Sequence, residues 1–321
     1  MPNLLTIAVF NLDEQYVQDV REAAGDSWEV FHARGADDVK KHIRETEIMY
    51  GNRLNDAILP DACALRWVQA TGAGVEHALT EAFASAPVIL TNASGIHSVQ
   101  MSEHALGMMV ALARHFHHYI RMQQEHKWDK SLGMSDMAEL SQKTLGILGL
   151  GAIGEALAER ARAFGMHVLG LKRSAGGYNG AADEAVGPDA LERVMRESDF
   201  LVNLLPLTPA TRGIISTEVI ASMKPGAFFI NLGRGGTVDE KALADALAQR
   251  AIAGAGLDVF EEEPLSEHSM LWTLDNVIIT PHVSGLSPRY WERATALFCE
   301  NIRRYRAGEE LLNVVDKGLG Y

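Results

Sequence analysis

The chain has 321 residues, and 47% of them are hydrophobic, which is enough for two domains with buried cores. Its formal net charge of -13 argues against a nucleic-acid partner, because phosphates are bound by clustered Lys and Arg. The two cysteines, Cys63 and Cys299, lie far apart in sequence. We therefore expect no disulfide framework, no CxxC metal site and a reducing, cytoplasmic location.

The N-terminal residues 4–10 are mostly apolar and have no basic start, so they predict a buried first strand rather than a signal peptide. No apolar run approaches the ~20 residues that a membrane helix needs. Two passages instead alternate short apolar runs with helical periods, which is typical of parallel sheets covered on both faces. We expect strands over 6–10, 28–31, 48–51, 67–70 and 88–91 in the first passage, and over 144–148, 167–172, 200–205, 228–231, 254–259 and 277–280 in the second.

A long helical stretch that begins near Ser98 separates the two passages, and a final helix is expected over 287–307. The first of these stretches leads into three histidines, His115, His117 and His118. No Asp, Glu or Cys is spaced with them to complete a metal site, so we expect no metal and assign them to a helical arm around 114–130.

Gly149-Leu150-Gly151-Ala152-Ile153-Gly154 matches the G-x-G-x-x-G fingerprint of dinucleotide-binding proteins, between an expected strand and an expected helix. Gly149 permits the tight turn, Gly151 lets the backbone approach the pyrophosphate, and Gly154 lets the helix pack on the strand. The helix N-terminus, with Ala152 and Ile153, supplies free N–H groups to the phosphates. A plain glycine turn is the alternative interpretation.

The expected second strand of this passage ends in Lys172-Arg173-Ser174, where an NAD-binding protein has an Asp or Glu for the adenosine ribose. A carboxylate would repel a 2′-phosphate, whereas Lys and Arg attract one and Ser can donate a hydrogen bond. These residues predict that NADP(H) is preferred and that NAD(H) can also bind. The alternative is that Lys172 and Arg173 are ordinary solvated charges.

Arg234, Glu263 and His282 each lie in a loop after a short apolar run downstream of this fingerprint. An Arg can grip a carboxylate with two parallel hydrogen bonds, and a His is a suitable acid near neutral pH. A neighbouring carboxylate favours imidazolium, which suits Glu263 as the partner of His282. Taken singly, each residue has a simpler explanation. Arg234 could form a surface ion pair, Glu263 could be one member of an acidic run, and His282 could be an ordinary loop histidine.

The order of these motifs, with Asp258-Val259-Phe260-x-x-Glu263-Pro264 and Pro281-His282, resembles the D-isomer-specific 2-hydroxyacid dehydrogenases over nearly the whole chain, in particular the glyoxylate/hydroxypyruvate reductase-like branch. The resemblance implies that Arg234 binds the substrate carboxylate and carbonyl oxygen, that Glu263 pairs with His282, and that His282 is the general acid/base. It implies an α/β protein with two doubly wound parallel-sheet domains. A Rossmann dinucleotide-binding domain, 99–286, would be inserted in a flavodoxin-like substrate domain formed by 1–98 and 287–321, and an arm at about 114–135 would make the dimer contact.

The same resemblance assigns further contacts to residues of this chain. For the cofactor they are Leu205, Pro206 and Thr211 on the adenosine side, Leu232 and Gly233 near the nicotinamide, Asp258 at its carboxamide, and Ser284 and Gly285 on the same face. For the substrate they are the backbone of Gly72, Ala73 and Gly74, and the strand end Tyr50 and Gly51. Asp258 has an equally good alternative as a cap or buried hydrogen-bonded carboxylate. Arg53 could recognise a second anionic group, but an ordinary solvated loop residue is the preferred interpretation.

The sequence thus predicts NAD(P)H-dependent reduction of a small 2-oxo acid, such as glyoxylate, hydroxypyruvate or a longer uncharged analogue, to the D-2-hydroxy acid by a homodimer. In formate dehydrogenases the histidine motif looks like Gln-Pro-His. This chain has Thr280-Pro281-His282 instead, so formate dehydrogenases are disfavoured. Phosphoglycerate dehydrogenases with a regulatory extension are disfavoured because the chain stops at Tyr321. A corepressor-like module that senses the nicotinamide cofactor is the alternative from another class.

Overall fold

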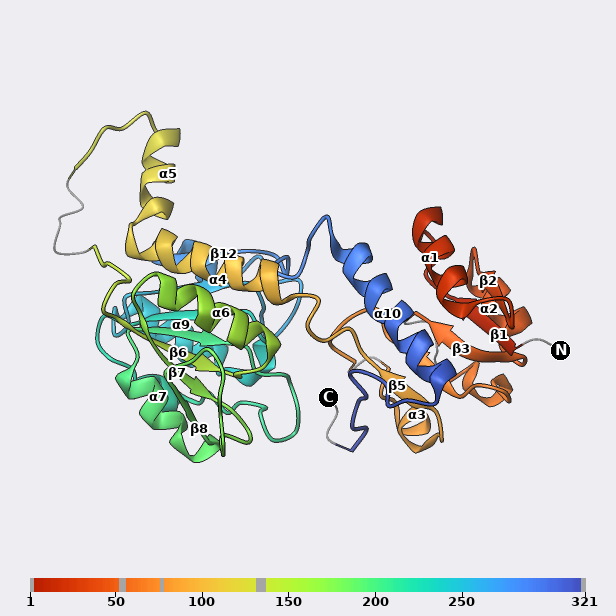
Figure 1. Cartoon of the computed structure of the whole chain (residues 1–321). Coiled ribbons are helices and arrows are strands. Elements are labelled where there is room, and N and C mark those ends of the chain that lie inside the picture. The colour runs from red at the N-terminus through yellow and green to blue at the C-terminus, as the bar shows by residue number, and fades with distance from the viewer. Residues whose placement is uncertain (1–2, 52–55, 76–77, 131–136, 319–321) are drawn as a thin grey trace. The chain divides into compact units, whose positions relative to one another are not determined.

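The computed structural model of the chain describes residues 3–51, 56–75, 78–130 and 137–318, and Figure 1 traces their helices and strands. The contacts between residues divide the chain into two compact units. Unit 1 consists of Met1–Ile96 and Ser287–Tyr321, and unit 2 is the intervening segment His97–Leu286. Each unit contains one parallel β-sheet of its own.

Unit 1 surrounds a five-stranded sheet. Its strands are β1 (Asn3–Ile7), β2 (Trp28–His32), β3 (Thr46–Tyr50), β4 (Trp67–Gln69) and β5 (Ile89–Thr91). Its helices are α1 (Glu14–Ala24), α2 (Ala36–His42), α3 (Glu81–Ser85) and α10 (Tyr290–Ala307), with a 3-10 turn η1 (Leu59–Asp61). The order β2-β1-β3-β4-β5, parallel throughout, is that of flavodoxin-like folds.

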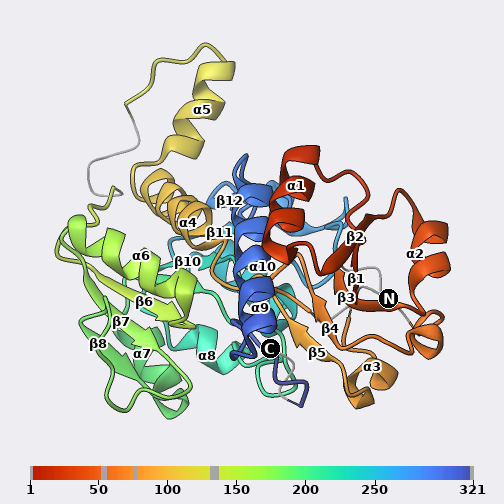
Figure 2. The same ribbon diagram turned by 45° about the vertical axis from the view of Figure 1, so that its right-hand side comes forward.

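The two faces of this sheet carry separate cores. On one face α1 and α10 lie side by side, as Figure 2 shows, and bury Val17 and Phe298 against Leu5 and Ile48. The second core gathers Met49 and other apolar side chains that alternate with the first set along the strands. Burial on both faces explains why these strands read as continuous apolar runs in the sequence.

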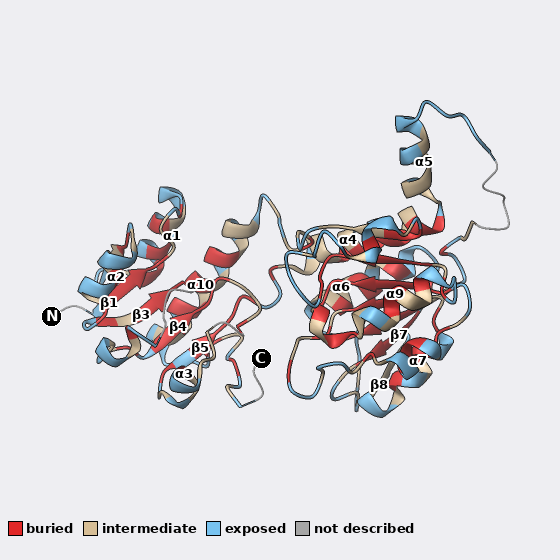
Figure 3. Cartoon of the chain, turned by 180° about the vertical axis from the view of Figure 1, so that it is seen from behind, coloured by how far each residue is buried: buried red, intermediate tan, exposed pale blue. Residues whose placement is uncertain are grey.

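Unit 2 surrounds a seven-stranded sheet. Its strands are β6 (Thr144–Leu148), β7 (His167–Leu171), β8 (Glu184–Val186), β9 (Phe200–Asn203), β10 (Phe228–Asn231), β11 (Gly254–Leu257) and β12 (Val277–Ile279). Its helices are α4 (Ser98–Ala113), α5 (Phe116–Gln124), α6 (Ala152–Ala163), α7 (Leu191–Glu197), α8 (Thr217–Ala221) and α9 (Glu240–Ala248), with 3-10 turns η3 (Pro188–Ala190), η4 (Gly235–Thr237) and η5 (Met270–Thr273). Figure 3 shows its strands as mostly buried and α5 as mostly exposed.

The order of this sheet, β12-β11-β10-β9-β6-β7-β8, creates a switch point. The chain runs outward from β6 to β8, returns to β9 on the other side of β6, and then runs outward to β12. In open parallel sheets, ligands bind outside the carboxyl ends of the strands at such a reversal. The prediction of two parallel-sheet α/β domains is confirmed, and the residues after β6 and β9 are where a dinucleotide is expected.

Several predicted strand boundaries were wrong. Strand β1 begins at Asn3 and ends at Ile7, because Val9 and Phe10 extend the apolar run but pack on the cores from the following loop. Leu205 and Val259 similarly prolong two runs beyond β9 and β11, since they are buried in loops. Strand β8 was not predicted, because its three half-buried residues lie at the edge of the sheet and show no apolar run.

Two helices are also shorter than predicted. The final helix α10 begins at Tyr290 rather than 287. In the arm, α5 ends at Gln124, and Trp128 lies beyond it with 93% of its surface exposed. The arm's predicted residues 131–135 lie outside the described part of the chain.

Candidate active site

The glycine fingerprint forms the turn between β6 and α6. Gly149 has φ +103°, and a Cβ there would lie 3.1 Å from the carbonyl carbon of Leu204 in the loop after β9. A Cβ at Gly154 would lie 2.7 Å from the Gly149 oxygen, whereas at Gly151 it would meet nothing within 4 Å. The first N–H groups of α6, at Ala152 and Ile153, have no partner within the helix. The loop therefore offers free amides and an open face to a phosphate.

A basic corner adjoins this loop at the end of β7. The Lys172 ammonium donates to the carbonyl of Leu150, at 3.2 Å, and lies 5.9 Å from the ring centroid of Tyr178. Arg173 and Ser174 are exposed. The Lys172 charge is thus held against the fingerprint loop itself, where an adenosine ribose is bound in Rossmann folds.

The loop after β9 is tied together by Thr211. Its hydroxyl donates to the carbonyl of Pro206, at 2.5 Å, and accepts from the amide of Thr208, at 2.8 Å. Leu205 is buried, and its carbonyl oxygen would lie 2.7 Å from a Cβ at Gly233. The backbone after β9 and the backbone after β10 are therefore in close contact. The hydrogen bonds of the Thr211 hydroxyl thus stabilise the loop to which Thr211 belongs.

A buried polar network that sequence reasoning missed supports the loop after β10. Asn203 Nδ2 donates to Asn231 Oδ1, at 2.9 Å, and to Thr237 Oγ1, at 2.8 Å. The Asn231 oxygen also accepts from the Gly233 amide, at 3.2 Å, and the Thr237 hydroxyl donates to the carbonyl of Arg234, at 2.6 Å. The sequence does contain a signal for this network, because each of the buried strands β9 and β10 ends in an Asn.

Arg234 follows directly on this network, with its side chain half-buried. Its Nη1 donates to the Gly233 carbonyl, at 2.9 Å. A Cβ on the next residue, Gly235, would lie only 1.9 Å from the carbonyl carbon and oxygen of Phe260. The absence of a side chain at Gly235 thus lets the loop after β10 touch the loop after β11.

The loop after β11 presents Glu263, and the loop after β12 presents His282. Glu263 Oε1 accepts from the amide of Phe260, at 3.0 Å, and Oε2 lies 2.7 Å from His282 Nδ1. The two side chains are 36% and 50% exposed. A carboxylate at Nδ1 orients the ring and leaves Nε2 for a substrate, which is the arrangement of a general acid/base.

Asp258 organises the turn that carries His282. Its fully buried carboxylate accepts from the Thr280 hydroxyl and from the amides of Val283 and Ser284, the last two at 2.9 Å. Burial alone would raise the pKa of this carboxyl, but these hydrogen bonds lower it below its usual value. Of the two roles considered for Asp258, its contacts in the structure are those of a buried, hydrogen-bonded carboxylate, and Ser284 is one of its donors.

The backbone of His282 depends on the same residue. The His282 amide donates to the Asp258 carbonyl, at 2.8 Å, and His282 has φ +53°. A second group that was missed is His104 on α4, whose Nε2 lies 3.2 Å from Thr280 Oγ1 and whose pKa is lowered by burial. A polar residue on the same helical face as Met101 and Met108 was the signal for it.

Apart from Arg234, the predicted substrate contacts lie in unit 1. The carbonyls of Gly72 and Ala73 accept from the Ala93 amide and the Asn92 side chain, each at 2.9 Å. The amides of Gly72, Ala73 and Gly74 have no acceptor among the described residues. They are therefore available to a carboxylate.

The other residues of unit 1 that were predicted to contact the substrate, Tyr50 and Gly51, do not offer accessible polar groups in this way. Tyr50 was expected to line a pocket, but its side chain is fully buried and stacks on Phe298 with ring centroids 4.2 Å apart. The reason is that β3 is buried on both faces. Gly51 has φ +143° and lies against the backbone of Ala8, and Arg53 lies outside the described residues.

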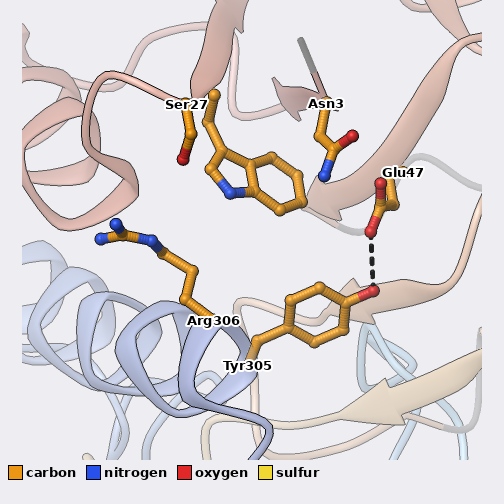
Figure 4. Close-up of a pocket in the computed structure, with 6 residues that line it drawn as sticks. Asn3, Ser27, Glu47, Tyr305 and Arg306 are labelled. Atoms are coloured by element: carbon orange, nitrogen blue, oxygen red, sulfur yellow. Dashed lines mark hydrogen bonds between the residues drawn. The ribbon is translucent and has the colours of Figure 1, made fainter.

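A hollow of about 360 Å³ in unit 1 is drawn in Figure 4 and lies elsewhere. It is lined by Asn3, Ser27, Trp28, Glu47, Tyr305 and Arg306, and the Tyr305 hydroxyl donates to Glu47, at 2.9 Å. Asn3, Trp28 and Glu47 are at the amino ends of β1, β2 and β3. The Gly72 loop follows a carboxyl end, so this hollow is not the candidate substrate site.

Comparison with known proteins gives the class. Residues 106–284 match the family model described as D-isomer specific 2-hydroxyacid dehydrogenase, NAD binding domain. Glyoxylate reductase of Pyrococcus furiosus is 34% identical over 288 residues, which cover 86% of this chain and 83% of that protein. D-3-phosphoglycerate dehydrogenase of Methanocaldococcus jannaschii is 34% identical over 286 residues, covering 87% of this chain; the chain spans about half, 53%, of that longer protein.

Among solved structures, a D-isomer specific 2-hydroxyacid dehydrogenase of Xanthobacter autotrophicus, in complex with NADPH and MES, is 31% identical with a TM-score of 0.85, and the alignment covers 100% of both chains. The chain belongs to the D-isomer-specific 2-hydroxyacid dehydrogenase family. Within the described residues, no helix is both long enough and apolar enough to cross a membrane.

Proposed function

We propose that this protein reduces a small 2-oxo acid, such as glyoxylate or hydroxypyruvate, to the D-2-hydroxy acid with NADPH. The observation that carries the proposal is the contact between Glu263 and His282, at 2.7 Å, on loops adjoining the one that holds Arg234. The glyoxylate reductase among the relatives supports the substrate class.

Each residue of the site has its own role in the proposed reaction. The fingerprint loop, with the first amides of α6 and Lys172, would hold a nicotinamide cofactor, which when bound would supply the hydride for the carbonyl carbon. Arg234 holds the substrate oxygens with its guanidinium, which is always charged and matches a carboxylate in shape. His282 gives its proton to the developing alkoxide, and Glu263 stabilises the imidazolium that exists before the transfer. The amides of Gly72, Ala73 and Gly74 are the proposed backbone contacts for the substrate carboxylate.

Purified protein mixed with NADPH and a panel of 2-oxo acids tests this proposal. We expect loss of the reduced-nicotinamide absorbance with at least one short, uncharged 2-oxo acid, and formation of the D product in a chiral assay. Binding of NADPH without turnover on any member would contradict the enzyme assignment and support a cofactor-sensing module instead. Turnover restricted to a phosphorylated substrate would overturn the proposed substrate class.

We propose that Lys172 makes NADP(H) the preferred cofactor. The anchored Lys172 ammonium beside the fingerprint loop supports this, as does the NADPH bound to the Xanthobacter relative. Lys172→Asp should lower the NADPH-to-NADH affinity ratio about 10- to 100-fold, because a charge-assisted hydrogen bond is replaced by repulsion. Fluorescence titration of both cofactors measures the ratio. The control is Lys241→Asp, because Lys241 is an exposed residue of α9. An unchanged ratio would show that Lys172 is an ordinary solvated charge.

The pairing of Glu263 with His282 predicts a loss of rate when the pair is weakened. Glu263→Gln keeps the shape of the side chain but replaces the charge-assisted hydrogen bond to His282 Nδ1 by a neutral one. kcat/KM for 2-oxo acid reduction at a fixed pH should then fall by a factor of about 2–5, because a half-exposed ion pair contributes up to about 1 kcal/mol. Glu262→Gln removes the same charge from the exposed neighbouring residue and should leave kcat/KM at the parent value. An unchanged kcat/KM in Glu263→Gln would refute the pairing.

We also propose roles for the two units, a homodimeric assembly and a cytoplasmic location. Unit 2 is the dinucleotide-binding domain, and unit 1 is the substrate domain. A homodimer is supported by the arm, where Phe116, Ile120 and Trp128 expose apolar surface that a second copy would cover. A cytoplasmic location is supported by the free thiols of Cys63 and Cys299.

A further inference from the structure

Three histidines gather at the junction of α4 and α5 in unit 2, although the sequence predicted no metal there because no Asp, Glu or Cys is spaced with them. Each of His115, His117 and His118 offers one ring nitrogen, and these nitrogens all lie within 4.8 Å of one another. We propose that the three imidazoles bind a first-row transition-metal ion such as Zn²⁺, Ni²⁺ or Cu²⁺. Imidazole nitrogen is a preferred ligand for each of these ions, and the site is independent of the dehydrogenase reaction.

The backbone brings the rings together. Helix α4 ends at Ala113 and α5 begins at Phe116, so the chain turns sharply at His115 (Figure 1), which has φ +56°. This left-handed residue turns its side chain toward the first turn of α5, where His117 and His118 lie. The ring centroids of His117 and His118 are 4.2 Å apart, and that of His115 is 5.4 Å from His118 and 6.0 Å from His117.

The distances fit a metal after small side-chain rotations. In a tetrahedral zinc site with Zn–N bonds of about 2.0–2.1 Å, the ligand nitrogens are about 3.4 Å apart. The three nitrogens are already within 4.8 Å of one another, so rotation of half-buried rings suffices to close the site. Among the described residues the cluster consists of three protein ligands, which leaves a fourth position for water.

One ring is already oriented as in known metal sites. Nδ1 of His117 lies 3.3 Å from the carbonyl oxygen of Ala111, in the last turn of α4. A ring that donates from Nδ1 to a carbonyl keeps Nε2 as the metal-binding nitrogen, and such outer contacts are typical of metal-bound histidines. A bound ion would therefore fasten the start of α5 to the end of α4.

The surrounding charges set the affinity. Arg121 lies on α5 one turn beyond His117 and His118, so its positive charge would repel a bound cation, whereas the neighbouring Asp275 carboxylate would attract one. Asp275 holds two arginines, because Arg250 pairs with its carboxylate and Arg121 Nη1 donates to its carbonyl, at 3.2 Å. Removing the Arg121 charge should tighten metal binding, and removing the Asp275 charge should weaken it.

The test uses the untagged, full-length protein after treatment with EDTA, titrated with Zn²⁺ by calorimetry and with Co²⁺ by visible absorption. We expect saturation near one equivalent per chain, with a cobalt spectrum that indicates nitrogen ligands. His117→Ala and His118→Ala should each weaken binding at least about tenfold, the lower end of what loss of even an outer-sphere partner costs. Arg121→Gln should strengthen it.

The matched control is His126→Asn, an exposed histidine farther along the arm whose φ of +56° Asn also tolerates. Because the chain has 12 histidines, this control separates the cluster from general surface binding. NADPH turnover by every variant verifies folding and should match the parent. Absence of saturable binding, or equal losses in His117→Ala and His126→Asn, would overturn the proposal.

Discussion

Replacement of His282 by Ala should lower kcat for 2-oxo acid reduction by about 10²–10⁴. The imidazole is the proposed proton donor, so its removal takes away the acid itself, while Glu263 loses the ring that it orients through Nδ1. Binding of NADPH should be nearly unchanged, since the fingerprint loop after β6 does not depend on this side chain. Steady-state kinetics and a fluorescence titration of the same sample measure both quantities.

The control for this prediction is His268→Ala. His268 belongs to the loop after β11, which also carries Glu263; it is highly exposed and forms an ion pair with its neighbour Glu267, at 3.7 Å. This variant should retain the parent kcat. If His282→Ala also kept kcat within about threefold of the parent, well short of the usual contribution of a general acid, another group would be the donor and the assignment would fail.

Replacement of Gly235 by Ala should reduce kcat/KM by roughly 10²-fold, although the change adds one methyl group and removes no reacting group. The new Cβ would lie 1.9 Å from the carbonyl carbon and oxygen of Phe260, so one of the two backbones must move by more than 1 Å to reach a normal contact. That movement would separate Arg234 from the loop that holds Glu263. A displacement of this size at a catalytic group is enough for the expected loss.

The same overpacking should lower the free energy of unfolding by about 1–3 kcal/mol. Chemical denaturation followed by circular dichroism measures this change. Gly236→Ala is the matched control, because its Cβ would meet the flexible ends of two side chains, Leu207 at 3.2 Å and Arg212 at 3.6 Å, and no backbone atom is among its nearest contacts. We expect near-parent stability and activity there. Comparable losses in both variants would show that the loop tolerates no side chain at all, rather than that Gly235 is a specific contact point.

The sequence predicted most strands and the nucleotide loop because these depend on local patterns. Apolar runs of four or five residues and the glycine spacing after β6 are readable without knowledge of the fold. The ends of runs were misread where loop residues such as Val9 and Leu205 are buried. An apolar residue signals burial, and it does not signal strand geometry.

The roles of individual polar residues were harder to predict, because they depend on partners distant in sequence. Asp258 was a cofactor contact or a buried carboxylate with equal weight, and its hydrogen bonds with Thr280, Val283 and Ser284 join residues 22 to 26 positions apart. His104 reaches Thr280 across 176 positions, which no spacing rule detects. Tyr50 was misplaced because a strand end can carry a core residue as well as a pocket residue.

Asp258 fixes the turn that carries His282 through contacts within the protein. The amides of Val283 and Ser284 donate to its carboxylate, and its backbone carbonyl accepts from the His282 amide, which holds His282 in a left-handed conformation. The free energy that positions this backbone is therefore part of the folding reaction, and little of it needs to be drawn from substrate binding. Residues that contact the substrate tail could consequently change during evolution without displacing the proposed proton donor.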